Sequence, residues 1–466
     1  MRKTLLSLLS ALTFLSLQAQ DISGQWNGIL KVQGTQLRLV FHLTQNGEGY
    51  DATMDSPDQG ARGIPVTTVR FDPPGLRLEV APAGIVYEGS LTPDNRIAGT
   101  FKQGGLSLPL DLSREMPEKE PLLRPQEPKP PYPYQAEEIT FENPGAGITL
   151  SGTLTLPKGK GPFPAVVLIT GSGPQNRDEE VFGHKPFLVL ADYLTRKGIA
   201  VLRYDDRGTG KSTGNFSAAT TKDFATDVES AVKFLRVRGE TNPEMIGLVG
   251  HSEGGLIAPM VAANRDNAIA FIVLLAGPGV PGYDILLAQT ELIGKAGGMD
   301  PEALDAQVTG LKGALDLVVE NPDPEALKLP LTAYLEKRLE EHPETVPQGV
   351  TQEQYVKGFV AQMSSPWMVS FLTLDPGTNL RQVRCPVLAL NGEKDLQVPA
   401  KLNLEAIKRH LKAGGNQQVT IQELPGLNHL FQGSETGAPS EYAGIEETFA
   451  PQALERIAAW ILEQGQ

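Results

Sequence analysis

The stretch "MIGLVGHSEGGLIAP" (245–259) places a serine, Ser252, between two glycines inside an otherwise apolar segment. The apolar run 245–250 predicts a buried strand, and the run that begins at Gly254 predicts a helix. A G-x-S-x-G pattern between a strand and a helix is typical of a sharp turn that holds the serine strained and exposed. Side chains at 250 and 254 would collide where the helix turns back, so glycine is needed at both positions. The stretch therefore predicts a nucleophilic serine at the end of a strand.

A nucleophilic serine needs a base, and the base needs a carboxylate that orients it. His429 lies in "LPGLNHLF", just after the last predicted strand, and Asp395 lies in "NGEKDLQVP", just after the strand before it. Both side chains follow strands whose carboxyl ends meet at one edge of a sheet, so they can converge on Ser252. The sequence thus predicts the triad Ser252, Asp395 and His429. We expect His251 to pack beside the turn, and we leave open whether His184 lines the pocket.

Ester or amide cleavage also needs two backbone N–H groups that stabilise the developing oxyanion. The amide of Glu253, directly after the serine, is the first expected donor. The second is expected from "GSGP" (171–174), where glycines let the backbone approach a substrate closely. Ser172 is our first choice there and Gly173 the second. The Glu253 side chain has three open roles, which are binding Arg177, binding a substrate amine, and facing solvent.

The length of 466 residues predicts two or three domains. Residues 21–113 alternate apolar and polar side chains, which predicts a small all-β barrel or sandwich with Trp26 in its core. Residues 114–137 contain seven prolines and predict an extended linker. Residues 138–466 alternate apolar strands with amphipathic helices, which predicts a mainly parallel eight-stranded sheet covered on both faces. A helical insertion at about 278–380 is expected to form a cap.

Residues 1–20 have the pattern of a secretory signal, since two cations precede an apolar run that ends near Ala19. The run is too short to span a bilayer, and no later stretch predicts a membrane helix. We therefore expect an exported protein, periplasmic or extracellular. Without Arg2 and Lys3 the chain has 39 basic and 55 acidic residues, a net charge of −16, which argues against a nucleic-acid partner. The single cysteine, Cys385, excludes an internal disulfide, and the oligomeric state stays open.

Two other kinds of site are not predicted. The segment "DDRGTGKSTG" (205–214) contains Gly-Lys-Ser after a strand, but Asp205 stands where a phosphate-binding loop has glycine. We expect a turn there, with Asp206 and Arg207 as a structural pair. The sequence contains no His-Glu-x-x-His motif, no paired cysteines and no Asp-rich calcium loop, so no metal and no cofactor is predicted.

Five motifs together resemble the α/β-hydrolase superfamily, within it the serine-aminopeptidase-like and dienelactone-hydrolase-like bacterial esterases. The motifs, all between residues 138 and 466, are "GSGPQNRDE", "RYDDRGTGKS", "GHSEGG", "NGEKDLQVP" and "LPGLNHLF". The resemblance implies a serine esterase that forms an acyl-enzyme without a cofactor. The roles it implies are Ser252 as nucleophile, His429 as general base and then acid, Asp395 as its orienter, and Ser172 and Glu253 as oxyanion donors.

The resemblance favours small carboxylic esters with short acyl chains as substrates. One alternative in the same fold is an amide hydrolase similar to serine aminopeptidases. An alternative of another class is a polymer-binding protein whose β domain binds the polymer while the hydrolase domain is silent. Three aromatic residues of the predicted cap are either pocket lining or, as we prefer, part of the core of the cap, namely Tyr334, Trp367 and Phe371.

Overall fold

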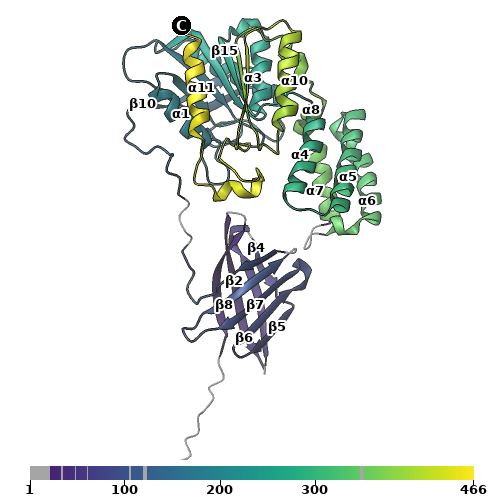
Figure 1. Ribbon diagram of the computed structural model, residues 1–466. Helices are drawn as coiled ribbons and strands as arrows, with labels where there is room; N and C mark the ends of the chain where they lie inside the picture. Colours follow the sequence, from purple (N-terminus) through teal and green to yellow (C-terminus); the bar gives the residue numbers. More distant parts are fainter. Residues whose placement is uncertain are drawn as a thin grey trace, which may run out of the picture. The chain divides into compact units, whose positions relative to one another are not determined.

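The computed structural model describes residues 21–465 apart from 33–34, 48, 60, 104–105, 119–122 and 347–350. The predicted signal, residues 1–20, lies outside the described residues. The chain divides into two compact units, Met1–Glu120 and Pro121–Gln466, and each has a core of its own (Figure 1). Within the described residues, no helix has the length and apolar character needed to cross a membrane.

The first unit consists of a four-stranded and a five-stranded sheet, both antiparallel, as the period-2 pattern predicts. The first sheet contains β1 (Gly24–Val32), β2 (Thr35–Asn46), β3 (Gly49–Ser56) and β4 (Ala61–Pro65), with the short 3₁₀ turn η1 (Pro57–Gln59). The second contains β5 (Thr68–Asp72), β6 (Gly75–Val80), β7 (Ile85–Leu91), β8 (Ile97–Gln103) and β9 (Leu106–Pro109), with η2 (Ala81–Ala83).

The two sheets are joined along both sides, so they form a small barrel. On one side, Ser113 pairs with Asn27 of β1 while the preceding Leu112 pairs with Ile97 of β8. On the other side, the chain passes directly from one sheet to the other, because the amide of Val66 donates to the carbonyl of Ala52 in β3 and the amide of Thr67 donates to the carbonyl of Glu79 in β6. This arrangement confirms the predicted all-β domain.

Large side chains fill one end of this barrel. Trp26, Phe41 and Tyr87 are fully buried, and the rings of Phe41 and Tyr87 lie 5.8 Å apart. The guanidinium of Arg114 lies 3.8 Å from the Trp26 ring, where a cation is attracted by the π face. Trp26 is therefore the core residue that the sequence predicts.

The second unit is built on an eight-stranded sheet with the order β10-β11-β13-β12-β14-β15-β16-β17. β11 is antiparallel to both of its neighbours, and all pairs from β13 onward are parallel. This confirms the predicted mainly parallel sheet. The strands are β10 (Gln135–Asn143), β11 (Ile148–Leu156), β12 (Phe163–Ile169), β13 (Ala200–Tyr204), β14 (Thr241–His251), β15 (Phe271–Leu275), β16 (Val387–Gly392) and β17 (Val419–Leu424).

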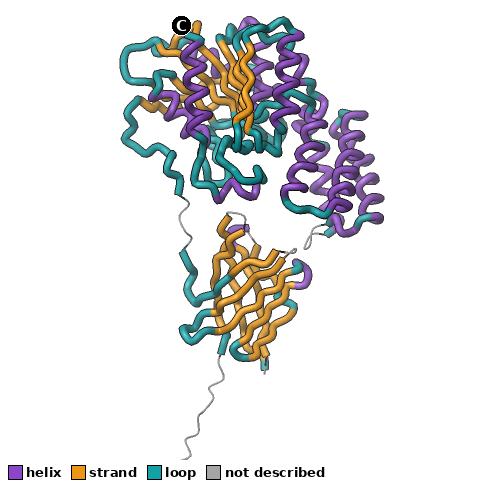
Figure 2. Tube along the Cα trace, in the orientation of Figure 1, coloured by secondary structure: helices purple, strands orange, loops and turns teal. Residues whose placement is uncertain are grey.

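Helices cover both faces of this sheet, as fully apolar strands require, and Figure 2 shows them flanking the strands. One core layer includes side chains of α2, α3 and α10, and the other includes side chains of α1 and α11. These helices are α1 (Pro186–Arg196), α2 (Thr221–Arg236), α3 (Gly254–Ala263), α10 (Ala400–Ala413) and α11 (Pro451–Glu463), with the 3₁₀ turns η3 (Arg265–Asn267) and η5 (Pro439–Gly444).

A helical insertion, here called the cap, separates β15 from β16. Its elements are α4 (Gly282–Ala296), α5 (Pro301–Glu320), α6 (Pro324–Glu341), η4 (Pro343–Thr345), α7 (Gln352–Met363), α8 (Pro366–Thr373) and α9 (Pro376–Leu380). The cap has an apolar cluster of its own, and this cluster includes Leu256 from the first turn of α3. The cap therefore packs directly on the helix that follows Ser252.

Each end of the segment predicted as a linker, 114–137, belongs to the unit that it adjoins. Arg114 packs on Trp26 in the first unit, and Gln135 begins β10 in the second. Between them, Arg124 donates to the carbonyls of Gly183, Ala443 and Ile445. A proline-rich segment satisfies few of its own hydrogen bonds, and here side chains fix it to the second unit. The part of this segment that has no such contacts is thus shorter than the predicted linker of residues 114–137.

Candidate active site

Ser252 occupies the predicted turn between β14 and α3 and has a φ of 51°, a left-handed conformation that is costly for a residue with a Cβ. A Cβ added to Gly250 would lie 2.0 Å from the Gly254 carbonyl oxygen. A Cβ added to Gly254 would lie 2.2 Å from the Ile169 carbonyl oxygen in β12. Both glycines are therefore required by the close approach of backbone to backbone.

Asp395 and His429 lie together, as loops after β16 and β17 permit. His429 Nδ1 is 2.8 Å from Asp395 Oδ2, and both residues are buried. The other oxygen of Asp395 accepts from the amides of Gln397 and Val398, each at 2.8 Å, which fixes the carboxylate. Among the described residues, no hydrogen bond joins Ser252 Oγ to His429. The predicted base and its orienter are thus in contact, while the serine is held separately by its turn.

His251 links the turn to the His429 loop. Its Nε2 is 3.0 Å from the His429 carbonyl oxygen, and the two rings lie 4.8 Å apart. Its Nδ1 is 2.9 Å from Glu179 Oε1. Burial lowers the pKa of His251, but the Glu179 carboxylate, the His429 carbonyl and the Asp395 charge together outweigh burial and hold this pKa above its ordinary value. The ring packs beside the turn, as expected, and it also fixes the position of the His429 backbone.

Glu179 is a supporting residue that the sequence analysis missed. Its Oε1 accepts from the Gly171 amide at 2.8 Å as well as facing His251, and its side chain is almost fully buried. It therefore ties the predicted oxyanion loop to the residue before Ser252. A glutamate in "QNRDEE" looks like one of the polar residues that are common in exposed loops, so only its burial in the structure reveals this role.

The two expected oxyanion donors have free amides. Among the described residues, neither the amide of Ser172 nor that of Glu253 donates to another protein atom. Their loops lie close together, since a Cβ added to Gly171 would be 3.2 Å from Ser252 Cβ. Unpaired backbone N–H groups beside a nucleophile are what an oxyanion site requires. The assignment of Ser172 and Glu253 as donors stays a prediction.

The Glu253 side chain takes none of the three roles left open. It is 3 % exposed, and its Oε1 accepts from Thr221 Oγ1 at 2.7 Å and from Trp367 Nε1 at 2.9 Å. Burial raises the pKa of this carboxyl. Arg177 instead pairs with Asp205, its Nη2 lying 2.8 Å from Oδ2. The Glu253 carboxyl therefore joins the turn to the cap helix α8.

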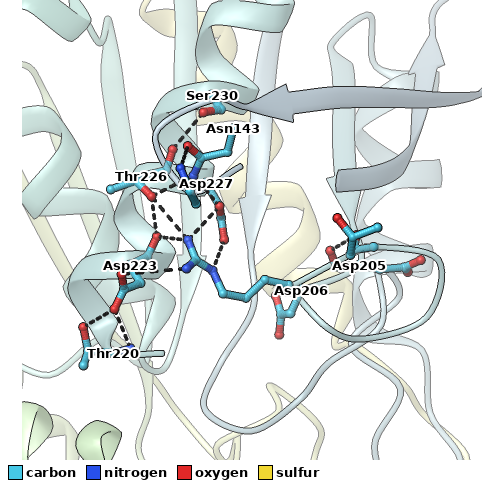
Figure 3. A network of polar contacts seen from close by, with 12 residues as sticks. Asn143, Asp205, Asp206, Thr220, Asp223, Thr226, Asp227 and Ser230 are labelled. Atoms are coloured by element: carbon cyan, nitrogen blue, oxygen red, sulfur yellow. Dashed lines mark hydrogen bonds and ion pairs between the residues drawn. The ribbon is translucent and has the colours of Figure 1, made fainter. Parts of the chain in front are cut away.

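The expected pair of Asp206 and Arg207 is wrong. Arg207 Nε donates to Asp227 Oδ2 at 2.7 Å, and Asn143 donates to the other oxygen of Asp227. Figure 3 shows this cluster with Asp206 lying apart from it. Asp206 instead accepts from Thr170 Oγ1 at 2.8 Å and from the amide of Gln175. The two neighbours bind different elements, which adjacency in the sequence cannot indicate.

His184 and the cap aromatics also find structural roles. Nδ1 of the fully buried His184 is 3.0 Å from Thr448 Oγ1, and burial lowers its pKa to about 4. It holds the segment before α11 rather than a substrate. Trp367 stacks on Phe371 with ring centroids 5.2 Å apart, and Tyr334 donates to the Gly310 carbonyl. These contacts agree with the preferred expectation that the cap aromatics form its core.

The cap contains an apolar groove of about 620 Å³. Its lining residues include Leu286, Ile293, Leu311, Phe359, Met363 and Met368. Met363 and Met368 also belong to the cluster that contains Leu256 of α3. The groove and the helix after Ser252 therefore share one apolar layer. Within the described ranges, no group of three or more His, Cys, Asp or Glu side chains is arranged to hold a metal ion.

Comparisons with known proteins find a family model, a curated relative and a solved structure to which this chain is similar. The family model described as "Serine aminopeptidase, S33" matches residues 185–295. The chain is 26% identical over 334 residues to the esterase EstD of Thermotoga maritima, covering 72% of this chain and 69% of that protein. The Pyrococcus furiosus esterase Pf2001 aligns in structure with a TM-score of 0.42 and 17% identity, over 72% of this chain and 91% of the esterase. The sheet order and the serine turn show that the second unit has the α/β-hydrolase fold, and the match to the family model lies within this unit.

Proposed function

We propose that this protein is a serine hydrolase of carboxylic esters, in which Ser252, His429 and Asp395 form the triad. The contact between His429 Nδ1 and Asp395 Oδ2 carries the proposal, because it leaves Nε2 as the nitrogen that can take a proton. The strained turn at Ser252 and the similarity to an esterase support it.

In this proposal, His429 Nε2 removes the proton from Ser252 Oγ as the oxygen attacks the ester carbonyl. The amides of Ser172 and Glu253 then donate to the oxyanion, and His429 returns the proton to the leaving alcohol. Water attacks the acyl-enzyme by the same route and releases the acid. The hydrogen bond between nucleophile and base commonly forms only in the substrate complex.

The proposed substrates are esters with a short, apolar acyl chain. The apolar groove of the cap shares a cluster with Leu256, four residues after Ser252, which supports an apolar group near the reacting carbonyl. The amide-hydrolase alternative needs Glu253 or a cap carboxylate as a ligand for a substrate amine. The Glu253 side chain is already bound by Thr221 and Trp367, so this residue does not favour the alternative.

Hydrolysis of p-nitrophenyl esters from acetate to laurate tests the proposal. We expect turnover of the short esters, and a loss of roughly 10⁴- to 10⁶-fold in Ser252→Ala and His429→Ala. Asp395→Asn is expected to be severely impaired, because it removes the carboxylate that orients the base. Ser217→Ala, an exposed serine outside the site, is the matched control and should retain full activity.

Two results would overturn the assignment. Undiminished ester hydrolysis by Ser252→Ala would place the nucleophile elsewhere. Rapid cleavage of amino-acid anilides without turnover of any ester would support the amide hydrolase instead. We also propose export, which the signal-like residues 1–20 support; N-terminal sequencing that finds Met1 on the mature protein would refute it.

A further inference from the structure

The barrel of the first unit is hollow at the end opposite Trp26. A cavity of about 310 Å³ lies among inward-facing side chains of both sheets. Its apolar lining includes Leu30, Leu39, Met54, Ile64, Ile85 and Phe101. Four of these six belong to β1, β2, β7 and β8, the strands that contribute Trp26, Phe41, Tyr87 and Ile97 to the filled end. The same strands thus build a packed end and an open one.

The chemistry of the cavity selects a guest whose buried part is uncharged and apolar. Among the described residues that line it, none is charged, and the polar ones are Ser56, Gln59 and Gln103. Ser56 Oγ donates to Gln59 Oε1 at 2.7 Å, and Gln103 Nε2 donates to the Ala83 carbonyl at 3.0 Å. Both glutamines are exposed, so they mark the mouth of the cavity. An occupant therefore has an apolar body inside and its polar group at this mouth.

An empty apolar cavity of this size is unfavourable. Protein interiors contain few voids larger than a water molecule, and the atoms that line a void lose dispersion contacts. Water fits such a space poorly because it needs two to four polar partners. An apolar chain restores those contacts, and small closed barrels have room for one small ligand. At about 310 Å³ the cavity lies at the small end of ligand pockets, which excludes a polymer as its occupant.

We infer that this cavity is a binding site for a single fatty acyl chain of medium length, whose head group lies beside Gln59 and Gln103. The lining is mainly branched aliphatic side chains with one aromatic ring, which suits a flexible alkyl chain. The site is independent of Ser252, so it stands or falls separately from the proposed esterase. The first unit thus acquires a function that no comparison assigns.

Methyl NMR of the full-length protein with ¹³C-labelled methionine tests the inference, with decanoate below its micellar concentration as the probe. Met54 lines the barrel cavity, whereas Met299, Met363 and Met368 line the cap groove, so their methyl signals separate the two sites. We expect the Met54 signal, assigned with Met54→Leu, to shift saturably. An unchanged Met54 signal while the cap signals shift would overturn the inference.

A cavity-filling variant gives the second test. Leu39→Trp places an indole in the hollow and is expected to weaken decanoate binding at least tenfold, as measured on the remaining Met54 shift. Thr100→Trp is the matched control, because Thr100 neighbours the inward Phe101 and points to the opposite face. Equal affinity in Leu39→Trp and the wild type would refute the site. If Leu39→Trp does not fold, the response of the Met54 signal in the wild-type protein still decides whether decanoate binds in the cavity.

Discussion

Asp206 is a buried carboxyl whose hydrogen bonds connect the loops around the proposed nucleophile. It accepts from Thr170 and from the Gln175 amide, on either side of the predicted oxyanion loop. Burial raises the pKa of Asp206 to about 8, because an ionised carboxylate loses its hydration there. At neutral pH this side chain therefore stabilises the loop mainly as the neutral acid.

The raised pKa of Asp206 predicts a pH-dependent stability. The native state keeps the proton up to about pH 8, whereas the unfolded chain releases it near pH 4. The unfolded state is thus favoured as pH rises between these values, and the contribution of Asp206 to stability is lost through that window. We expect Asp206→Asn, which imitates the neutral acid, to match the wild type at pH 4 and to be more stable at pH 8. Urea unfolding at both pH values measures this. A wild-type advantage that grows toward pH 8 would contradict it.

Residue identities near the site were predictable to different degrees. Ser252, Asp395 and His429 could be proposed because motif spacing and chain order restrict the choices. The partners of Glu253 and Arg207 could not, since Trp367 and Asp227 come from separate elements. A contact between distant segments leaves no periodic signal in one sequence.

The serine turn depends on glycines at fixed positions, and this gives a prediction for the element. Gly254→Ala puts a methyl group into the Ile169 carbonyl, so the strand or the helix must shift at a cost of about 3 kcal/mol. We expect a lower melting temperature and a large loss of esterase activity.

Gly358→Ala is the matched control for that substitution. Gly358 lies inside α7, its added Cβ meets no atom within 4 Å, and the change should stabilise the helix by about 0.5–1 kcal/mol. Calorimetry of both variants would show opposite shifts. Equal shifts would mean that close packing at the turn does not explain the need for Gly254.

The strands of the large sheet and the helical content of the cap were predictable from apolar runs and from helical stretches in the sequence. The contacts that fix the segment 114–137 to the second unit could not be predicted, since single side chains make them. Arg124 reaches three carbonyls, and Gln126 accepts from the amides of Thr448 and Phe449. A high proline content predicts an extended backbone, but it does not indicate which surface that backbone packs on.

Arg124 also gives a prediction for the whole molecule. Arg124→Ala leaves the carbonyls of Ala443 and Ile445 without this donor and should destabilise the second unit by about 2 kcal/mol. Lys129→Ala, an exposed change in the same segment, should have little effect. In a Trp26→Phe background, the fluorescence of Trp367 and Trp460 reports the second unit alone. An unchanged midpoint for Arg124→Ala would show that the segment is not anchored there.

The cap lies between two strands that are neighbours in the sheet, and this affects the order of folding. β15 and β16 pair in parallel although roughly 110 residues separate them, and contacts so distant in sequence form slowly. The turn of Ser252 belongs to the half of the sheet that precedes this closure. Asp395 and His429 belong to the half that follows it. The proposed acid and base therefore reach Ser252 only after the long loop has closed, so catalytic competence is expected to be the last property that the folding chain acquires.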